Sequence, residues 1–244
     1  NAQDVNGDGL TDILVTAHLA APNGGNSGAA FVVFGKKDTI AVELSAVQGG
    51  TGGFVMNGVG SGDRAGRSAS TAGDVNGDGY SDLLVGAPTD DPNGDSSGAA
   101  FVVFGKTGTT AIDLSNVESG IGGFVINGAS AGDQAGVTTA YAGDINGDGL
   151  DDLLVGAKFA DPGGRNDAGA SYVVFGKKDT AAIELSNVES GTGGFVINGK
   201  VAGDHAASVG TAGDFNGDGL NDILVGAPEA DTSGADSGSA YLIF

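Results

Sequence analysis

Four short segments of this sequence place carboxylate side chains at alternate positions. Each segment has the pattern Asp-x-Asn-Gly-Asp-Gly-x-x-Asp, and the four begin at Asp4, Asp74, Asp144 and Asp214, 70 residues apart. Carboxylates this close together repel one another, and a bound cation relieves the repulsion. Ca²⁺ accepts about six to eight oxygen ligands, whereas Mg²⁺ requires stricter octahedral geometry and keeps its water. The spacing therefore predicts one Ca²⁺ site in each segment, four in all.

The ligands predicted in each loop are the side chains at positions 1, 3, 5 and 9 and the backbone carbonyl at position 7. Glycines at positions 4 and 6 allow the positive φ values that turn these oxygens inward. The predicted ligands are Asp4, Asn6, Asp8, Leu10 and Asp12; Asp74, Asn76, Asp78, Tyr80 and Asp82; Asp144, Asn146, Asp148, Leu150 and Asp152; and Asp214, Asn216, Asp218, Leu220 and Asp222.

Two other interpretations of these loops fit less well. An EF-hand loop needs a bidentate Glu at position 12 and flanking helices. Here position 12 is valine in all four loops, and a β-type apolar run follows it. Asn-Gly and Asp-Gly pairs also form simple tight turns. A simple turn does not explain three aspartates at fixed positions in each of four loops.

The sequence offers little for catalysis. The two histidines, His18 and His205, occupy non-equivalent positions, and we predict that both are solvated loop residues. The segment from Gly94 to Gly98 matches the Gly-x-Ser-x-Gly pattern of esterases, but it lies in a predicted hairpin loop rather than at a strand-to-helix turn. Carboxylates that repeat regularly indicate metal sites rather than one acid–base pair. We therefore predict that the chain is not an enzyme.

A second group of acidic residues lies in the hairpin loops outside the four segments. Asp90, Asp91 and Asp161 are predicted to be solvated charges rather than a second metal site.

Short apolar runs around each loop predict the strands that position it. Taking the second repeat as the example, we expect strands at residues 65–72, 82–85, 99–104 and 123–127, because these runs are short and bounded by Gly, Asp, Asn and Pro. The first strand, repeated at 135–142 and 206–212, is built of small residues. It is therefore placed innermost, where the sheets converge. Phenylalanines that recur in the fourth strands are predicted core residues: Phe54, Phe124 and Phe195.

The connection before each fourth strand predicts one helical turn on the outside of the sheet. At residues 114–120, Ser115 and Glu118 have the spacing of a capping box, and Gly120 provides a stop. Ser45 with Gln48, and Ser186 with Glu189, repeat the pattern.

The fold class predicted is all-β: a β-propeller of four-stranded antiparallel blades, with about 3.5 repeats of 70 residues. Residues 1–244 are predicted to form a single propeller segment, with repeats at about 1–62 (incomplete), 63–132, 133–203 and 204–244 (incomplete). Two such chains would not close neatly into a ring, because their junction lacks a fourth and a first strand. We therefore expect a segment of a larger propeller of the seven-bladed type.

Composition excludes several classes of function. The formal net charge is −21, and 31 acidic residues oppose 10 basic ones. Such a chain is repelled by phosphate backbones and anionic lipid, which argues against nucleic-acid binding. No apolar run approaches the roughly 20 residues that span a bilayer, so membrane insertion is not expected. There is no Cys, and the chain begins at Asn1, which indicates a processed or excised piece.

These repeats resemble the FG-GAP repeats of integrin α-subunit propellers and of many bacterial surface proteins. The Gly-Ala-Pro motif that gives the family the second half of its name is present at residues 86–88 and 226–228. The corresponding residues differ at 156–158 (Gly-Ala-Lys) and 16–18 (Thr-Ala-His). The Phe-Gly half is replaced by Ala65-Gly66, Ala135-Gly136 and Ala206-Ala207. The resemblance implies four antiparallel strands per repeat, usually seven blades, and calcium in the hairpin between the first and second strands. It also implies a secreted or cell-surface location.

The function predicted is a calcium-binding extracellular propeller module for cell adhesion or protein–protein interaction. Its partner would be another protein or a cell-surface ligand, or a second copy that associates through the open repeat ends. Two alternatives stay open. The chain forms a structural coat or fibre, or it is the non-catalytic propeller arm of a secreted hydrolase or a lectin. A lectin is less favoured, since sugars stack on aromatic rings and the chain has no Trp and four Tyr.

Overall fold

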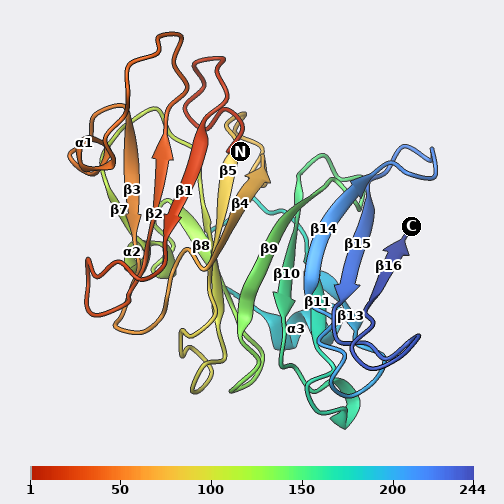
Figure 1. Cartoon of the computed structure of the whole chain (residues 1–244). Coiled ribbons are helices and arrows are strands. Elements are labelled where there is room, and N and C mark those ends of the chain that lie inside the picture. The colour runs from red at the N-terminus through yellow and green to blue at the C-terminus, as the bar shows by residue number, and fades with distance from the viewer. Residues whose placement is uncertain (1) are drawn as a thin grey trace.

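The four repeats fold into four β-sheets that lie side by side in chain order (Figure 1). The structure is a computed structural model that describes residues 2–244; Asn1, the first residue of the first predicted repeat, lies outside the described residues. Residues 2–244 form sixteen strands, three short α-helices and one 3₁₀ turn, η1 (Pro162–Gly164). The predicted all-β class is confirmed. The sheets form an open, partial β-propeller.

The two middle sheets contain the four predicted strands of a complete blade. One sheet has β4 (Ser68–Gly73), β5 (Asp82–Ala87), β6 (Ala99–Val103) and β8 (Gly123–Asn127). The next sheet has β9 (Ala135–Gly143), β10 (Asp152–Ala157), β11 (Ala170–Val174) and β13 (Gly194–Asn198). Neighbouring strands in both blades are antiparallel. The strand prediction is confirmed to within three residues at each end.

The two outer sheets lack one strand each. The first contains β1 (Ile13–Ala17), β2 (Ala29–Val33) and β3 (Gly53–Asn57), which correspond to the second, third and fourth strands of a blade. The last contains β14 (Ser208–Gly213), β15 (Asp222–Ala227) and β16 (Ser239–Ile243), which correspond to the first three strands. This is the distribution of strands expected from the sequence.

The strands of small residues lie where the sheets meet, as predicted. β9 packs against both β4 and β14 of the neighbouring sheets. Ser68 Oγ donates a hydrogen bond to the carbonyl of Gly136 at 2.8 Å, and Thr139 Oγ1 donates to Ser68 Oγ at 3.1 Å. A Cβ built on Gly86 would stand 2.0 Å from the carbonyl oxygen of Gly136. Larger side chains would therefore force the sheets apart here.

The three helical turns begin differently from the prediction and end as predicted. They are α1 (Leu44–Gln48), α2 (Leu114–Glu118) and α3 (Leu185–Glu189). Gly120, at φ +77°, ends α2 because the amides of residues 120 and 121 bind the carbonyls of Val117 and Asn116. The predicted capping box is wrong. Asp113 is the N-cap without a side-chain cap bond, and Ser115 lies inside the helix.

Two short strands not expected from the sequence join neighbouring blades. β7 (Ile112–Asp113) pairs in parallel with β3, and β12 (Ile183–Glu184) pairs in parallel with β8. Asn57 Nδ2 donates to Asp113 Oδ1 at 3.0 Å, and Asn127 Nδ2 donates to Glu184 Oε1 at 2.7 Å. Each of these sheets is therefore completed by a segment of the following repeat, so the sheet borders cross the predicted repeat borders.

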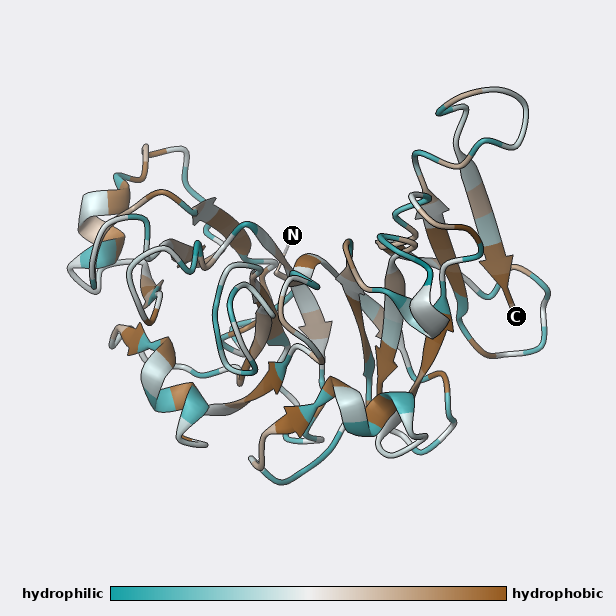
Figure 2. Cartoon of the chain, turned by 90° about the horizontal axis from the view of Figure 1, so that it is seen from below, coloured by the Kyte–Doolittle hydropathy of each residue, from teal (hydrophilic) through white to brown (hydrophobic). Residues whose placement is uncertain are grey.

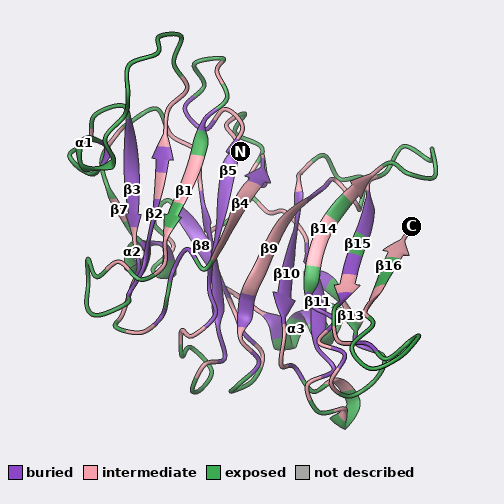
Figure 3. Ribbon diagram, viewed as in Figure 1, coloured by how far each residue is buried: buried purple, intermediate pink, exposed green. Residues whose placement is uncertain are grey.

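The core is made mainly of apolar strand residues, which are brown in Figure 2, and it includes buried helix residues such as Val117 and Val188. Burial is deepest in the two middle sheets (Figure 3). Phe54 and Phe124 are fully buried, as predicted. Lys106 Nζ lies 4.6 Å from the centre of the Phe54 ring, and Lys177 Nζ lies 4.7 Å from that of Phe124. Phe195 is 36% exposed, so its assignment to the core is wrong. The rings of Phe54 and Phe124 are each covered by a lysine of the following repeat. For Phe195 the following repeat is residues 204–244, which contain no lysine, so its ring is not covered in this way.

Candidate metal centres

Each predicted calcium loop closes around its first aspartate. In the loop at residues 74–82, between β4 and β5, Asp74 Oδ1 accepts the N–H groups of Gly77 at 2.8 Å and Asp78 at 3.0 Å. Its Oδ2 accepts the N–H of Gly79 at 2.9 Å. Gly77 and Gly79 have φ values of +78° and +90°, which favour glycine. The other three loops repeat these three bonds.

The side chains at positions 3 and 5 bind each other and the loop backbone. Asn76 Oδ1 accepts the Asp78 N–H at 2.7 Å, and Asn76 Nδ2 donates to Asp78 Oδ2 at 3.0 Å. Asp78 Oδ1 accepts the N–H of Tyr80 at 2.9 Å. An amide or carboxylate oxygen has a second lone pair, so these bonds leave acceptor capacity on each oxygen.

The aspartate at position 9 is buried beneath the loop. Asp82 is fully buried; its Oδ2 accepts the N–H of Val75 at 3.0 Å and its Oδ1 that of Gly105 at 2.8 Å. Burial, and to a lesser extent the charges of Asp78 and Asp74, raise the pKa of Asp82 to about 7. Burial likewise raises the pKa of Asp152 to about 6. These carboxylates tie the loop to the start of the second strand.

The donor set of the loops fits a hard cation, although the side chains do not converge on a common point. Within residues 2–244, no group of three or more acidic or histidine side chains is already gathered as a metal-binding cluster. Each loop nevertheless offers three carboxylates, one amide oxygen and one backbone carbonyl, which is the all-oxygen set that Ca²⁺ prefers. The loops therefore present suitable ligands for Ca²⁺. That these twenty residues coordinate the ion stays a prediction.

A second acidic region lies at the other end of the strands, in the loop between β5 and β6. Asp90 is half-buried there, so its assignment as a solvated charge is wrong, whereas Asp91 in the same loop is exposed, as predicted. Asp161, in the equivalent loop between β10 and β11, is also exposed, as predicted. Burial and the charges of Asp63 and Glu118 raise the pKa of Asp90 to about 7.

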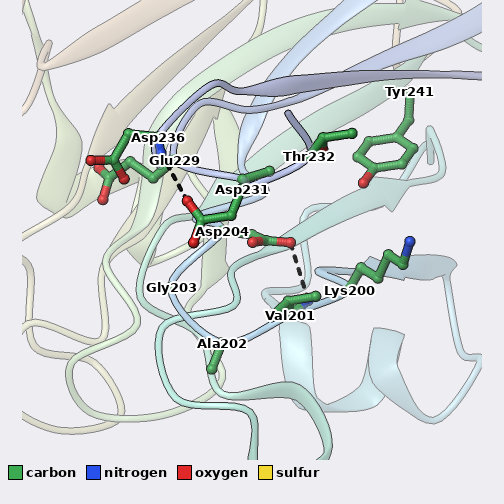
Figure 4. Close-up of a pocket in the computed structure, with 11 residues that line it drawn as sticks. Lys200, Val201, Ala202, Gly203, Asp204, Glu229, Asp231, Thr232, Asp236 and Tyr241 are labelled. Atoms are coloured by element: carbon green, nitrogen blue, oxygen red, sulfur yellow. Dashed lines mark hydrogen bonds between the residues drawn. The ribbon is translucent and has the colours of Figure 1, made fainter. Parts of the chain in front are cut away.

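Two pockets at this end were not predicted from the sequence. The larger, about 490 Å³, lies between residues 200–204 and the loop joining β15 to β16, and Figure 4 shows Asp204, Asp231 and Tyr241 around it. The smaller, about 430 Å³, is lined by Asp133 and Glu189 among others. The signal was available in the recurring Gly-Asp pairs that precede each first strand. Their aspartates are at most 8% exposed: Asp63, Asp133 and Asp204.

The histidines lie apart from the predicted metal loops. The side chain of His205 is 12% exposed; its Nδ1 lies 2.8 Å from Glu229 Oε2, and its ring packs edge-on against Phe159. The prediction that His205 is a solvated loop residue is therefore wrong. Ser96, the serine of the esterase-like pattern, lies in the loop between β5 and β6, as expected.

The repeated blades and their acidic hairpins define a repeat-built β-propeller of the integrin α type. The chain matches the FG-GAP repeat family at residues 1–33, 65–103, 136–174 and 206–243, and it belongs to that family.

Similar curated proteins fall into two groups. The chain is 32% identical to integrin alpha-PS5 of Drosophila melanogaster over 166 residues, or 66% of this chain and 14% of that protein. It is 29% identical to integrin alpha pat-2 of Caenorhabditis briggsae over 237 residues, or 92% and 17%. It is 31% identical to phosphatidylinositol-glycan-specific phospholipase D of Bos taurus over 175 residues, or 70% and 19%. The chain thus spans less than a fifth of each relative. Among residues 2–244, no helix has the length and apolar character needed to cross a membrane.

Proposed function

We propose that this chain is a calcium-binding β-propeller module that works in adhesion or protein–protein interaction, secreted or at a cell surface, without a catalytic step of its own. The supporting observation is the loop geometry. In all four loops one aspartate accepts the same three backbone N–H groups, and the remaining oxygen donors follow at the same spacing. The integrin alpha relatives support the adhesion part of the proposal.

The residues at positions 1, 3, 5, 7 and 9 of each loop would hold the ion. When bound, Ca²⁺ would offset the mutual repulsion of the three carboxylates and fix the hairpin between the first and second strands. The partner would be another protein or a cell-surface ligand. The net charge of −21 favours a surface of opposite sign.

Thermal unfolding with and without calcium tests the metal part. For affinities of extracellular type, on the order of 10⁻⁴–10⁻³ M, about 2 mM Ca²⁺ stabilises by about 1–2 kcal/mol at the tighter sites. We expect Tm in Ca²⁺ to exceed Tm in EGTA by about 5 °C or more. The same concentration of Mg²⁺ should give a smaller rise. Equal Tm values in Ca²⁺ and EGTA would overturn the proposal.

A matched pair of variants assigns the effect to the loops. Asp148→Ala removes a ligand from one loop and should reduce the calcium-dependent rise in Tm by about a quarter, since four sites contribute. Asp95→Ala removes an equal charge from an exposed position outside the loops and should leave the rise unchanged. Adhesion of cells to surfaces coated with the chain, compared in Ca²⁺ and EGTA, tests the second part.

The match to phospholipase D supports one alternative, a propeller arm of a larger enzyme. In that case the chain itself is still non-catalytic. Purified residues 1–244 should therefore show no phosphodiesterase activity on a glycosylated phosphatidylinositol, with or without Ca²⁺. Turnover by the purified chain would contradict the non-catalytic assignment.

A further inference from the structure

Asp151 holds the first aspartate of the preceding calcium loop. It occupies position 8 of the loop at residues 144–152, between two predicted ligands, but its bonds reach the loop at residues 74–82. The Asp151 N–H donates to the carbonyl of Asp74 at 3.1 Å, and Asp151 Oδ2 accepts the N–H of Asp74 at 2.8 Å. Both backbone polar groups of Asp74 are thus bound by one residue of the next repeat.

The carboxylate of Asp151 is itself held in place. Tyr141, on β9, donates its hydroxyl to Asp151 Oδ1 at 3.1 Å. Gly73 lies directly against the pair: a Cβ built there would stand 2.2 Å from Asp151 Oδ2 and 2.5 Å from Tyr141 Cε2. Gly73 also has a φ of +74°, so two independent features require glycine at this position.

The peptide group between Leu150 and Asp151 links the two loops. Its carbonyl is the predicted position-7 ligand of its own loop, and its N–H binds Asp74 of the preceding loop. Asp74 in turn organises the preceding loop through the three N–H groups that its carboxylate accepts. A shift of Asp74 would therefore move the oxygens of the whole loop.

The equivalent residues of the other loops bind differently. Ser81 donates its N–H to the carbonyl of Asp4 at 3.2 Å, but its hydroxyl binds Gln3 Oε1 and not the Asp4 N–H. Over residues 2–244, no hydrogen bond joins Asn221 to Asp144. The pair of hydrogen bonds to the backbone of the first aspartate is thus found at one of the three junctions between loops. Asn221, which lacks these bonds, provides a natural control position for substitution.

We propose that Asp151 is a positioning residue for the calcium site of the preceding repeat, which it supports without being one of its ligands. The inference rests on the proposed calcium binding. Groups that orient ligands from outside the coordination shell commonly contribute tenfold or more to metal affinity. Coupling between sites is typically worth 5- to 150-fold. We expect the lower end here, because the substitution removes only one of the two hydrogen bonds between Asp151 and Asp74.

Calcium titration followed by amide NMR resolves each loop separately. The Gly77 and Gly79 amides report the loop at 74–82, Gly147 and Gly149 report the loop at 144–152, and Gly217 and Gly219 report the last loop. Asp151→Ala should weaken Ca²⁺ binding at 74–82 about 5- to 10-fold, and more than at 144–152. Asn221→Ala should leave the loop at 144–152 within about twofold of wild type. Tyr141→Phe, which keeps the carboxylate, should weaken the loop at 74–82 about two- to threefold.

Asp151→Asn separates the hydrogen bond from the charge. Its amide oxygen can still accept the Asp74 N–H, so we expect an affinity within about twofold of wild type. An equal loss in the Asn and Ala variants would mean that charge alone acts, and it would overturn the proposal. So would an unchanged loop at 74–82 in Asp151→Ala. Tyr141→Phe provides the test if Asp151→Ala lacks dispersed strand amides in saturating Ca²⁺. Wild-type protein that shows no calcium shift in any loop would instead overturn the proposed function.

Discussion

Replacing Asp90 with alanine is expected to stabilise the protein above neutral pH. Asp90 is half-buried in the loop between β5 and β6, and burial together with the charges of Asp63 and Glu118 raises its pKa from 3.8 to about 7. The chain's other repeats show that alanine fits this position. The equivalent residues are Ala20, Ala160 and Ala230. In all four repeats, this residue makes the same two backbone hydrogen bonds across the loop.

The size of the gain follows from the pKa and the lost hydrogen bond. A rise of about three pKa units corresponds to at most about 4 kcal/mol, and water around the half-exposed carboxylate screens much of that penalty. Alanine also gives up the bond that Asp90 Oδ1 accepts from the Asp91 N–H at 3.0 Å, worth about 1 kcal/mol. We therefore expect a net gain of about 1–2 kcal/mol, or about 2–8 °C in Tm.

The gain has a defined pH window. Between about pH 4 and pH 7 the folded protein keeps the Asp90 proton while the unfolded chain loses it, so this group's contribution to stability falls as pH rises. The advantage of Asp90→Ala should therefore be complete at pH 8. At pH 4 it should vanish, leaving only the small loss from the missing hydrogen bond.

Thermal melts of wild type and Asp90→Ala at pH 4, 5.5 and 8, at constant calcium, measure the effect. Asp95→Ala, an exposed carboxylate in the same loop, should change Tm by little at any of these pH values. A lower Tm for Asp90→Ala at pH 8, or a difference independent of pH, would refute the reasoning.

Two further substitutions test the packing and the loop framework. Gly86→Ala should destabilise by about 2–3 kcal/mol in chemical denaturation, because its Cβ would meet the carbonyl of Gly136, whereas Gly108→Ala, with open space around it, should cost under about 1 kcal/mol. Equal losses would contradict the close approach of the sheets. Asp82→Asn, measured in EGTA, should cost about 1–3 kcal/mol because its amide cannot accept from both N–H groups that the carboxylate binds. An unchanged stability in EGTA would leave Asp82 with no structural role apart from metal binding.

The features encoded by local pattern could be predicted from the sequence. Apolar runs near Leu83 and Phe101 gave the strands, and glycine at position 120 gave the end of α2. The capping box failed because Ser115 and Glu118 have the right spacing but the wrong helix start. Residue 113 is held extended by its pairing with β3, so the helix begins one residue before Ser115.

The features set by contacts between repeats could not be predicted. β12 is two residues long, and its partner in β8 lies 57 residues earlier, so no local pattern marks it. The same holds for the candidate site. The spacing of the aspartates predicted the donor set, but the bonds from Asp151 to Asp74 depend on how two repeats are stacked. The burial of His205 likewise involves a neighbouring repeat, because its ring packs against Phe159.

The parallel pairing of β12 with β8 has a consequence for synthesis on the ribosome. Asn127 at the end of β8 meets Glu184 only after 57 more residues have been added, and the junction of β3 with β7 spans 56. At about 5–20 residues per second, translation takes roughly 3–11 s to cover that distance. During this interval the outer edge of each newly made sheet is open to pairing with other nascent chains. The propeller should therefore fold in order from its N-terminal end, with each sheet capped one repeat behind the point of synthesis.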